Sequence, residues 1–275
     1  SDSSSHCLLY SDKHGNGYSF CEFWSVSTAL RCFSWCRLTA TVILLITTLF
    51  GQAKAEHGPH SFAAIEGSLV RVLPTWLGYE RPGFGAPPGT APEGTGFAIA
   101  PLSPETPNAD SLYVLTAAHV VDRASRIEIQ SVDGTRVDVV LLASDPATDL
   151  ALLKLPFTLP PVALKIETPA VGSHACAAGN SFGLGISFSC GVVSATGRKN
   201  IGFNPVEDFI QTDAAVNPGA SGGLLVNAAG QGLGLIDAIF TKSEDSDAGV
   251  NFAVSAKLIK RVLLEWADQG DVFTH

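Results

Sequence analysis

Three short segments of the chain carry side chains that could together hydrolyse an amide bond. His119 lies near the end of the apolar run LTAAHVV, Asp149 begins the segment DLALLKL, and Ser221 lies in the glycine-rich segment NPGASGG. A serine hydroxyl is a weak nucleophile until a neighbouring imidazole removes its proton, and a carboxylate can orient that imidazole. We therefore predict that Ser221 is the nucleophile, His119 the general base and Asp149 the carboxylate that holds the second ring nitrogen.

The glycines around Ser221 have a separate chemical purpose. Because glycine adopts backbone angles that other residues avoid, the loop can turn several N–H groups toward one point. We predict that the backbone at Gly219, Ala220 and Ser221 forms an oxyanion hole, with the N–H groups of Gly219 and Ser221 as the donors. One such donor is typically worth about 3 kcal/mol in the transition state.

Each of these residues also has a plainer interpretation when taken alone. A single histidine in an apolar run is usually a packing residue, and an aspartate before a strand is usually a turn or cap residue. Asp145, four residues before Asp149, is the competing candidate for the orienting acid. We interpret Asp213, another carboxylate near the nucleophile, as structural. No cysteine or histidine spacing indicates a zinc site, so neither a metal nor another cofactor is expected.

The elements that would position these residues are short strands. Apolar runs of four to nine residues recur along the chain, and turn pairs such as Asp133-Gly134 and Ala229-Gly230 separate them. This pattern predicts an all-β barrel or sandwich. The predicted strands cover residues 96–100, 112–116, 126–129, 136–143, 150–155, 174–178, 186–193, 209–212, 223–227, 232–240 and 250–254. The segment 74–94, rich in proline and glycine, is predicted to be a surface loop.

One helix is predicted at the end of the chain. Ser255 can cap its N-terminus and Gly270 can end it. Its apolar face consists of Leu258, Ile259, Val262, Leu263 and Trp266. Such a helix would cover an apolar surface of the predicted barrel.

The composition limits the class of protein. The 275 residues carry a formal net charge of −9, with 46% hydrophobic and 16% charged residues. The high apolar content argues against disorder, and the acidic balance argues against nucleic acid as a partner.

The first 55 residues are predicted to be a leader. Arg37 precedes the apolar stretch 38–50, and an Ala-x-Ala site ends at Ala55, which together are typical of a secretory signal peptide cleaved after Ala55. The mature domain would then be 56–275. The alternative is a membrane anchor through residues 38–53, although a spanning helix needs about 20 apolar residues.

Two cysteines, Cys176 and Cys190, belong to the predicted mature domain. They lie at the two ends of a predicted hairpin, where they could face each other, and an exported protein can keep a disulfide. The alternative is a pair of small buried hydrophobic residues. Both interpretations stay open at the level of the sequence.

The segments LTAAHVV, ATDLALLKL and QTDAAVNPGASGGLL resemble the catalytic blocks of the HtrA/DegP family of trypsin-fold serine proteases. The segments GTGFAIA, AAGNSFGLG, GVVSATGR and VNFAVSAKLI also resemble family blocks, and the likeness covers about residues 66–268. The resemblance implies a chymotrypsin/trypsin-like double β-barrel with His119, Asp149 and Ser221 in the cleft, and it favours Asp149 over Asp145. The sequence departs from the family at Ala220, usually Asn, and at Leu224, usually Pro. It also lacks the PDZ domain that the family usually adds after the helix.

The resemblance also implies a function. It indicates a periplasmic or secreted serine endopeptidase that acts on unfolded or damaged polypeptides, and family assembly suggests a homotrimer. The alternative is a latent or non-catalytic protein-binding chaperone on the same fold. In trypsin-fold proteases the floor of the primary pocket lies six residues before the nucleophile, here at Ala215. With Ile236 and Asn251 on the walls, we predict cleavage after small or medium aliphatic residues, because an apolar floor cannot neutralise Lys or Arg.

Overall fold

The computed structural model describes residues 8–11, 17–20, 59–77, 93–100, 111–239 and 249–269. The chain divides into two units, Ser1–Ala55 and Glu56–His275. In the first unit, β1 (Leu8–Ser11) and β2 (Gly17–Phe20) form an antiparallel hairpin. The predicted signal segment 38–55 lies outside the described residues. Among the described residues, no helix is both long and apolar enough to cross a membrane.

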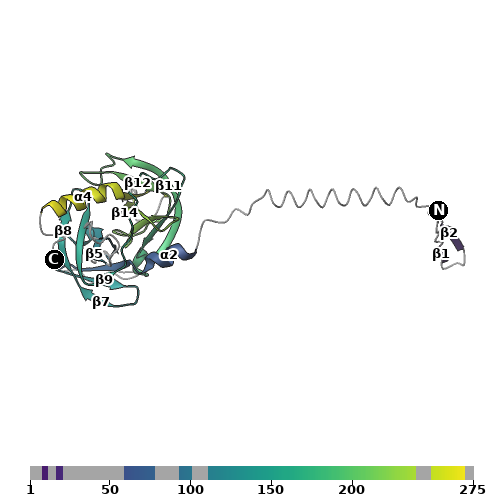
Figure 1. Cartoon of the computed structure of the whole chain (residues 1–275), viewed down its shortest axis with the longest axis horizontal. Coiled ribbons are helices and arrows are strands. Elements are labelled where there is room, and N and C mark those ends of the chain that lie inside the picture. Colours follow the sequence, from purple (N-terminus) through teal and green to yellow (C-terminus); the bar gives the residue numbers. More distant parts are fainter. Residues whose placement is uncertain are drawn as a thin grey trace. The chain divides into compact units, whose positions relative to one another are not determined.

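The second unit begins with a seven-stranded antiparallel sheet (Figure 1). The strands lie in the order β7–β6–β3–β4–β5–β9–β8. Their bounds are β3 Leu69–Thr75, β4 Gly94–Ala98, β5 Ser111–Ala117, β6 Arg126–Ser131, β7 Arg136–Asp138, β8 Val140–Asp145 and β9 Leu150–Leu159. Two helices accompany this sheet, α2 Pro59–Glu66 and the single-turn α3 Ala118–Val121.

A closed barrel follows, with the strand order β10–β11–β12–β15–β14–β13. The elements of this half are β10 His174–Gly179, the 3-10 turn η1 Ser181–Gly183, β11 Ser187–Arg198, β12 Phe209–Thr212, β13 Leu224–Asn227, β14 Gly232–Ile239, β15 Asn251–Ser255 and α4 Ala256–Asp268. The predicted all-β class with a C-terminal helix is therefore confirmed. Among the described residues, the second of these two sheets closes into a barrel and the first does not.

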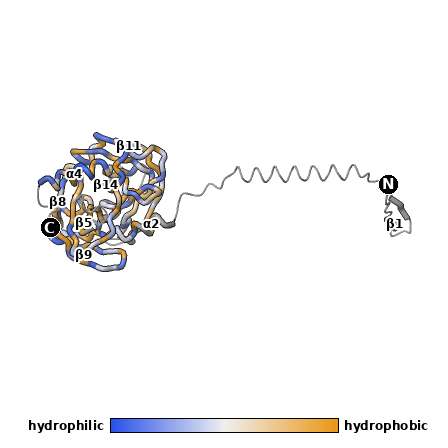
Figure 2. Tube along the Cα trace, viewed as in Figure 1, coloured by the Kyte–Doolittle hydropathy of each residue, from blue (hydrophilic) through white to orange (hydrophobic). Residues whose placement is uncertain are grey.

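The core of the second unit consists of aliphatic residues from both sheets, and Figure 2 shows their strands as largely hydrophobic. Phe97, Leu115 and Leu152 from the first sheet and Phe209 from the second are fully buried. A separate cluster of mostly small residues includes Ala175, Ala214 and Ala220. At about 25 cal/mol per Å² of apolar surface removed from water, this burial is the main favourable contribution to folding.

Helix α4 packs on β14 and β15, as predicted (Figure 1). The backbone N–H of Leu258 donates to the Ser255 side chain at 3.1 Å, which confirms the predicted N-cap. Leu258, Ile259, Val262, Leu263 and Trp266 are all buried. Gly270, the predicted helix end, lies outside the described residues.

The strand β3 was not predicted, and its last two residues, Pro74 and Thr75, fall in the segment 74–94 that was predicted to be a loop. In the structure β3 pairs with β4 only as far as Val72, whereas its pairing with β6 continues through Pro74 to Thr75. Among the described residues, therefore, Pro74 pairs with β6 alone, and the missing proline N–H removes no bond to β4. The segment 136–143 forms parts of two strands, β7 and β8, instead of one.

The disulfide Cys176–Cys190 joins β10 to β11, and the two cysteines are direct cross-strand partners. Of the two interpretations left open by the sequence, the structure therefore has the bridge.

We predict that the double variant Cys176→Ser, Cys190→Ser has a free energy of unfolding about 3 kcal/mol lower than the wild type. The bridge spans a sequence separation of 14. Closing a loop of this size lowers the conformational entropy of the unfolded chain, which is worth about 3 kcal/mol of stability. Urea titration with and without reductant measures it. The double variant should be insensitive to reductant; an equal response of both proteins would contradict the bridge.

Candidate active site

The pairing of β5 with β9 brings His119 and Asp149 together. Ala117, the last residue of β5, is the cross-strand partner of Leu150, the first residue of β9. His119 follows in α3 and Asp149 immediately precedes β9. The backbone N–H of Ala118 donates to the carbonyl of Asp149 at 3.0 Å, which fixes the two segments side by side.

Asp149 contacts His119 at two points. One carboxylate oxygen accepts the backbone N–H of His119 at 2.8 Å, and the other lies 2.6 Å from Nδ1 of the ring. Because a carboxylate only accepts, Nδ1 carries the proton and Nε2 is the free, basic nitrogen. The imidazole is 47% exposed and the carboxylate 8%. The site therefore pairs a solvent-facing imidazole with a buried carboxylate.

The electrostatics of Asp149 favour its charged form. Burial alone would raise the pKa of this carboxyl, but hydrogen bonds from His119 and from Asp237 lower it below its ordinary value. The competing acid, Asp145, is used elsewhere: it accepts the backbone N–H of Ala147 at 3.0 Å and the hydroxyl of Thr148 at 2.7 Å. Asp145 thus shapes the turn that leads to Asp149.

The loop that carries Ser221 packs against the same strands. The carbonyl of Ser221 accepts the backbone N–H of Thr95, in β4, at 2.8 Å. A side chain on Gly222 would come within 2.2 Å of the Thr95 carbonyl oxygen and 2.4 Å of the Thr116 hydroxyl. Gly222 therefore lets the nucleophile loop approach β5 three residues before His119.

The Ser221 hydroxyl itself points toward β14. Its oxygen lies 3.5 Å from the backbone carbonyl oxygen of Asp237, at the limit of a hydrogen bond. Among the described residues it makes no hydrogen bond with His119. Catalytic hydrogen bonds are often long in the absence of substrate, so a rotation of this side chain is the step that would join it to the base.

The predicted oxyanion loop has a defined conformation. Gly219 has φ of +97°, and an added side chain there would come within 2.3 Å of the carbonyl oxygen of Asn180. The N–H of Ala220 donates to Asn217 at 3.0 Å. Within the described part of the chain, by contrast, the N–H groups of Gly219 and Ser221 have no acceptor. These two donors are therefore available to a bound oxygen.

A threonine that the sequence did not single out holds this loop. The hydroxyl of Thr95, fully buried, donates to the carbonyl of Gly219 at 2.8 Å and accepts the backbone N–H of Asn180 at 2.9 Å. Its position in the segment GTGFAIA, which resembled a family block, was the available signal.

The residues predicted to form the specificity pocket lie in one region of the barrel. The backbone N–H of Ala215 donates to the Ser189 hydroxyl at 3.1 Å, and the Asn251 side chain donates to the carbonyl of Ala214 at 2.8 Å. Ile236 is 1% exposed and packs in the same small-residue cluster as Ala214 and Ala220. Their role in specificity stays a prediction.

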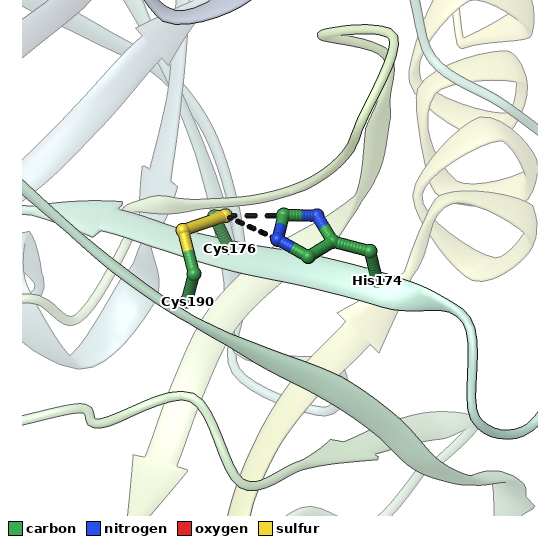
Figure 3. Close-up of side chains that lie close together, drawn as sticks. All are labelled: His174, Cys176 and Cys190. Carbon is green, nitrogen blue, oxygen red and sulfur yellow. Dashed lines mark hydrogen bonds between the residues drawn. A yellow bond between two sulfur atoms is a disulfide. The ribbon is translucent and has the colours of Figure 1, made fainter. Parts of the chain in front are cut away.

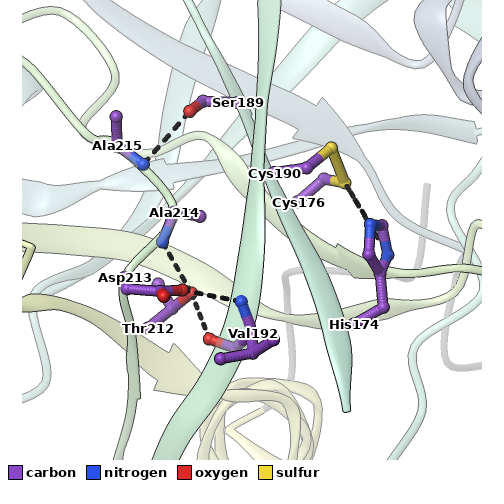
Figure 4. The surroundings of a disulfide bond; sticks show 9 residues. All are labelled: His174, Cys176, Ser189, Cys190, Val192, Thr212, Asp213, Ala214 and Ala215. Atoms are coloured by element: carbon purple, nitrogen blue, oxygen red, sulfur yellow. Dashed lines mark hydrogen bonds between the residues drawn. A yellow bond between two sulfur atoms is a disulfide. The ribbon is translucent and has the colours of Figure 1, made fainter. Parts of the chain in front are cut away.

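The disulfide lies beside the segment that contains Ala215 (Figure 4). The strand β11 bears Cys190 and, on either side of it, Ser189 and Val192; Asp213 accepts the Val192 N–H at 2.7 Å. This contact agrees with the structural interpretation of Asp213. Figure 3 shows the His174 ring against the bridge, with Nε2 3.7 Å from the sulfur of Cys176.

Two groups of described residues bring potential metal ligands together. In the first, His174, Cys176 and Cys190, both sulfurs are bonded to each other, so neither is the thiolate that zinc requires. In the second, His119, Asp149 and Asp237, one ligand atom from each residue lies within 4.8 Å of the others. Both oxygens of Asp149 already accept hydrogen bonds from His119.

The fold and these contacts place the chain in a known class. The sequence model of the trypsin-like peptidase domain family matches residues 94–235, just over half of the chain. The chain therefore belongs to the trypsin-like peptidase family.

Within that family the resemblance to HtrA/DegP-type proteases is confirmed. Periplasmic serine endoprotease DegP of Escherichia coli (strain K12) is 38% identical over 168 residues, which is 60% of this chain and 35% of DegP. Serine endoprotease DegS of Salmonella typhimurium is 39% identical over 167 residues, 58% of this chain and 46% of DegS. The chain thus matches less than half of the length of these relatives.

Solved structures agree with this assignment. The HtrA-type protease AlgW with a tripeptide superimposes with a TM-score of 0.65 at 34% identity, covering 77% of this chain and 64% of that one. The serine endoprotease from Yersinia pestis gives a TM-score of 0.60 at 30% identity, covering 76% of this chain and 66% of that one.

We predict that Thr95→Val lowers the free energy of unfolding by about 1–3 kcal/mol, because valine keeps the shape but leaves the buried N–H of Asn180 without an acceptor. Thr95→Ser keeps the hydroxyl and is the matched control. Denaturant unfolding measures both variants. A loss for Ser that exceeds the loss for Val would show that the methyl group, and not the hydroxyl, is what the loop needs.

Proposed function

We propose that this protein is a serine endopeptidase in which His119, Asp149 and Ser221 form the catalytic triad. The observation that carries the proposal is the two-point contact of Asp149 with His119, beside a glycine-rich serine loop, in a member of the trypsin-like peptidase family. Those relatives whose names state an activity are serine endoproteases.

The mechanism follows from the positions of the protons. Nε2 of His119 takes the proton of the Ser221 hydroxyl as its oxygen attacks the carbonyl carbon of the substrate, and the imidazolium is stabilised by the adjacent Asp149 carboxylate. The negative oxygen of the tetrahedral intermediate is held by the N–H groups of Gly219 and Ser221. His119 then protonates the leaving amine. Water next attacks the acyl group: His119 takes a proton from the water and returns it to the Ser221 oxygen, which releases the acid product.

The substrates proposed are unfolded polypeptides. An extended segment would bind beside the cleft as an additional strand, which pairs backbone groups and makes few demands on sequence. A homotrimer is the assembly proposed by analogy with the family.

The proposed location is the periplasm or the exterior of the cell. Several relatives are named periplasmic, and the stretch 38–50 with cleavage after Ala55 would direct export. An uncleaved leader would instead anchor the chain through residues 38–53, and N-terminal sequencing of the exported protein separates the two outcomes.

We predict that Ser221→Ala removes nearly all casein cleavage, since no other described side chain is placed to attack. Removal of a triad member typically lowers turnover by several orders of magnitude while leaving the fold intact. A quenched-fluorescence casein assay measures the rate, and circular dichroism confirms the fold. Residual turnover above one tenth of the wild-type rate would contradict the role of Ser221.

One observation favours a second function. The Ser221 hydroxyl faces the backbone carbonyl of Asp237, and among the described residues it makes no bond to His119. A chain locked in this arrangement would bind unfolded proteins without cleaving them, as a latent protease or chaperone. A fluorophosphonate probe separates the two: labelling that is lost in Ser221→Ala supports the enzyme, and absence of labelling in the presence of unfolded protein supports the binder.

We predict cleavage after Val, Ala, Ile or Leu, because Ala215 places no charge at the proposed pocket floor. Substitution Ala215→Asp should shift the preference toward Lys or Arg. A peptide library read by mass spectrometry measures the preference at the cleaved bond. Dominant cleavage after Lys or Arg by the wild type would overturn this assignment.

A further inference from the structure

An acidic side chain lies inside the apolar strand β14, next to the proposed triad. Asp237 is 7% exposed, and its neighbours along the strand include Leu235 and Ile236. A carboxylate in such a place is costly unless it is paired or keeps its proton. Asp237 has no part in the mechanism described above, so its presence needs an explanation.

The contacts of Asp237 supply one donor and one carboxyl neighbour. The side-chain amide of Asn204 donates to its Oδ2 at 2.7 Å. A carboxyl oxygen of Asp237 lies within 4.8 Å of one of Asp149, and a hydrogen bond between the two groups raises the pKa of Asp237 and lowers that of Asp149. In the described part of the chain, no Lys or Arg forms an ion pair with Asp237. A hydrogen bond between two carboxyl groups requires one proton, because ionised carboxylates only accept.

The distribution of donors decides which carboxyl keeps that proton. Asp149 receives two N–H groups from His119, one from the backbone and one from the ring. From the described residues, Asp237 receives only the amide of Asn204. The negative charge is therefore better stabilised on Asp149, and the proton stays on Asp237.

We propose that Asp237 is a positioning residue: its protonated carboxyl donates a hydrogen bond to Asp149 and holds that carboxylate against the His119 ring. The proposal rests on the proposed triad function, which it deepens. The backbone carbonyl of Asp237 lies 3.5 Å from the Ser221 hydroxyl, whereas the positioning role belongs to its side-chain carboxyl, which acts through Asp149.

The loop between β11 and β12 supports this arrangement. Glu207 accepts four backbone N–H groups from residues 201–204, at 2.7–3.2 Å, and so fixes the loop that presents Asn204. Burial alone would raise the pKa of Glu207, but these four donors lower it, which keeps the group negative.

The charged and titratable groups that face Asp237 agree with a retained proton. They are Asp149 before β9, His119 in α3 and Glu207 in the loop before β12. Burial raises the pKa of Asp237, and the hydrogen bond and charge of Asp149 and the charge of Glu207 raise it further, to about 9; Asn204 alone opposes this.

If Asp237 keeps its proton, the stability of the fold must depend on pH, and this prediction does not depend on catalysis. Between an unfolded pKa of about 4 and the folded value of about 9, the folded protein binds one proton more than the unfolded chain. Wild-type stability therefore falls as the pH rises through this window. Asp237→Asn keeps an amide donor of the same shape and does not titrate, so it should lack this fall.

The experiment measures unfolding of the full chain in urea at pH values from 5 to 8.5. The ratio of the folding constants of Asp237→Asn and wild type should rise by up to tenfold per pH unit, the limit for one proton. Asp268→Asn, which removes an exposed carboxyl, is the control and should give a constant ratio. A constant ratio for Asp237→Asn as well would show that Asp237 is ionised at neutral pH and would overturn the proposal.

Two further measurements keep the test decisive if Asp237→Asn does not fold. Infrared spectroscopy of the wild type with labelled aspartate should show a protonated carboxyl band at pH 7 that disappears above about pH 9; its absence at pH 7 overturns the proposal. The fluorophosphonate labelling rate of wild type should also decline above that pH. Where Asp237→Asn does fold, Asp237→Leu should label at pH 7 at least tenfold more slowly than Asp237→Asn, and equal rates would exclude the positioning role.

These outcomes separate the two proposals. If Ser221→Ala retains activity, the triad assignment fails, whereas the pH dependence of stability still tests the proton on Asp237. If the triad is active but the stability ratio is constant, the further inference alone fails.

Discussion

The contact between Asp149 and His119 is the interaction on which the rest of the site depends. It joins two strands that are neighbours in the first sheet, and it uses both carboxylate oxygens on one residue, so neither partner can rotate without breaking a bond. Asp149 adopts φ of +58°, an unusual conformation for a non-glycine residue. That local strain is compensated by the two hydrogen bonds, which are charge-assisted and therefore stronger than those between neutral groups.

The second requirement is close approach of two backbones. The serine loop comes from the closed barrel, whereas β4 and β5 belong to the other sheet, and glycines permit the contact at both sides. An added side chain on Gly94 would come within 3.3 Å of the Ser221 carbonyl oxygen, and one on Gly179 within 3.2 Å of the Thr95 hydroxyl. The Thr95 hydroxyl also bridges Gly219 and Asn180, so the serine loop is held both by this hydrogen-bonded bridge and by close packing at the glycines.

Much of this could be predicted from the sequence, because the fold follows from local patterns. Short apolar runs with turn residues gave the strands, and the capped apolar face gave α4. The end of β3 falls in the segment predicted to be a loop. Whether a strand tolerates Pro74 depends on its neighbours, and the pairing of β3 with β4 extends only to Val72, which is a fact of sheet topology. Helix α2 was not predicted, and it shows only weak amphipathic character.

The site was predictable in its residue types but not in its surroundings. His119, Asp149 and Ser221 were chosen for their chemistry, whereas Asp237 looked like one acidic residue in an apolar run. Its meaning depends on Asn204 and Asp149, which are 33 and 88 positions away in the sequence. A charged residue within a buried strand was the signal, and no local pattern could have named its partners.

The half-exposed imidazole of His119 has a consequence for how substrates are chosen. Water reaches the base in the free protein, where it weakens the attraction between the ring and the charges around it. A long extended chain laid across the cleft would displace that water, whereas a dipeptide would leave much of it in place. The protein would then prefer long polypeptide substrates because they remove water from the His119 imidazole, and no separate pocket for substrate length would be needed.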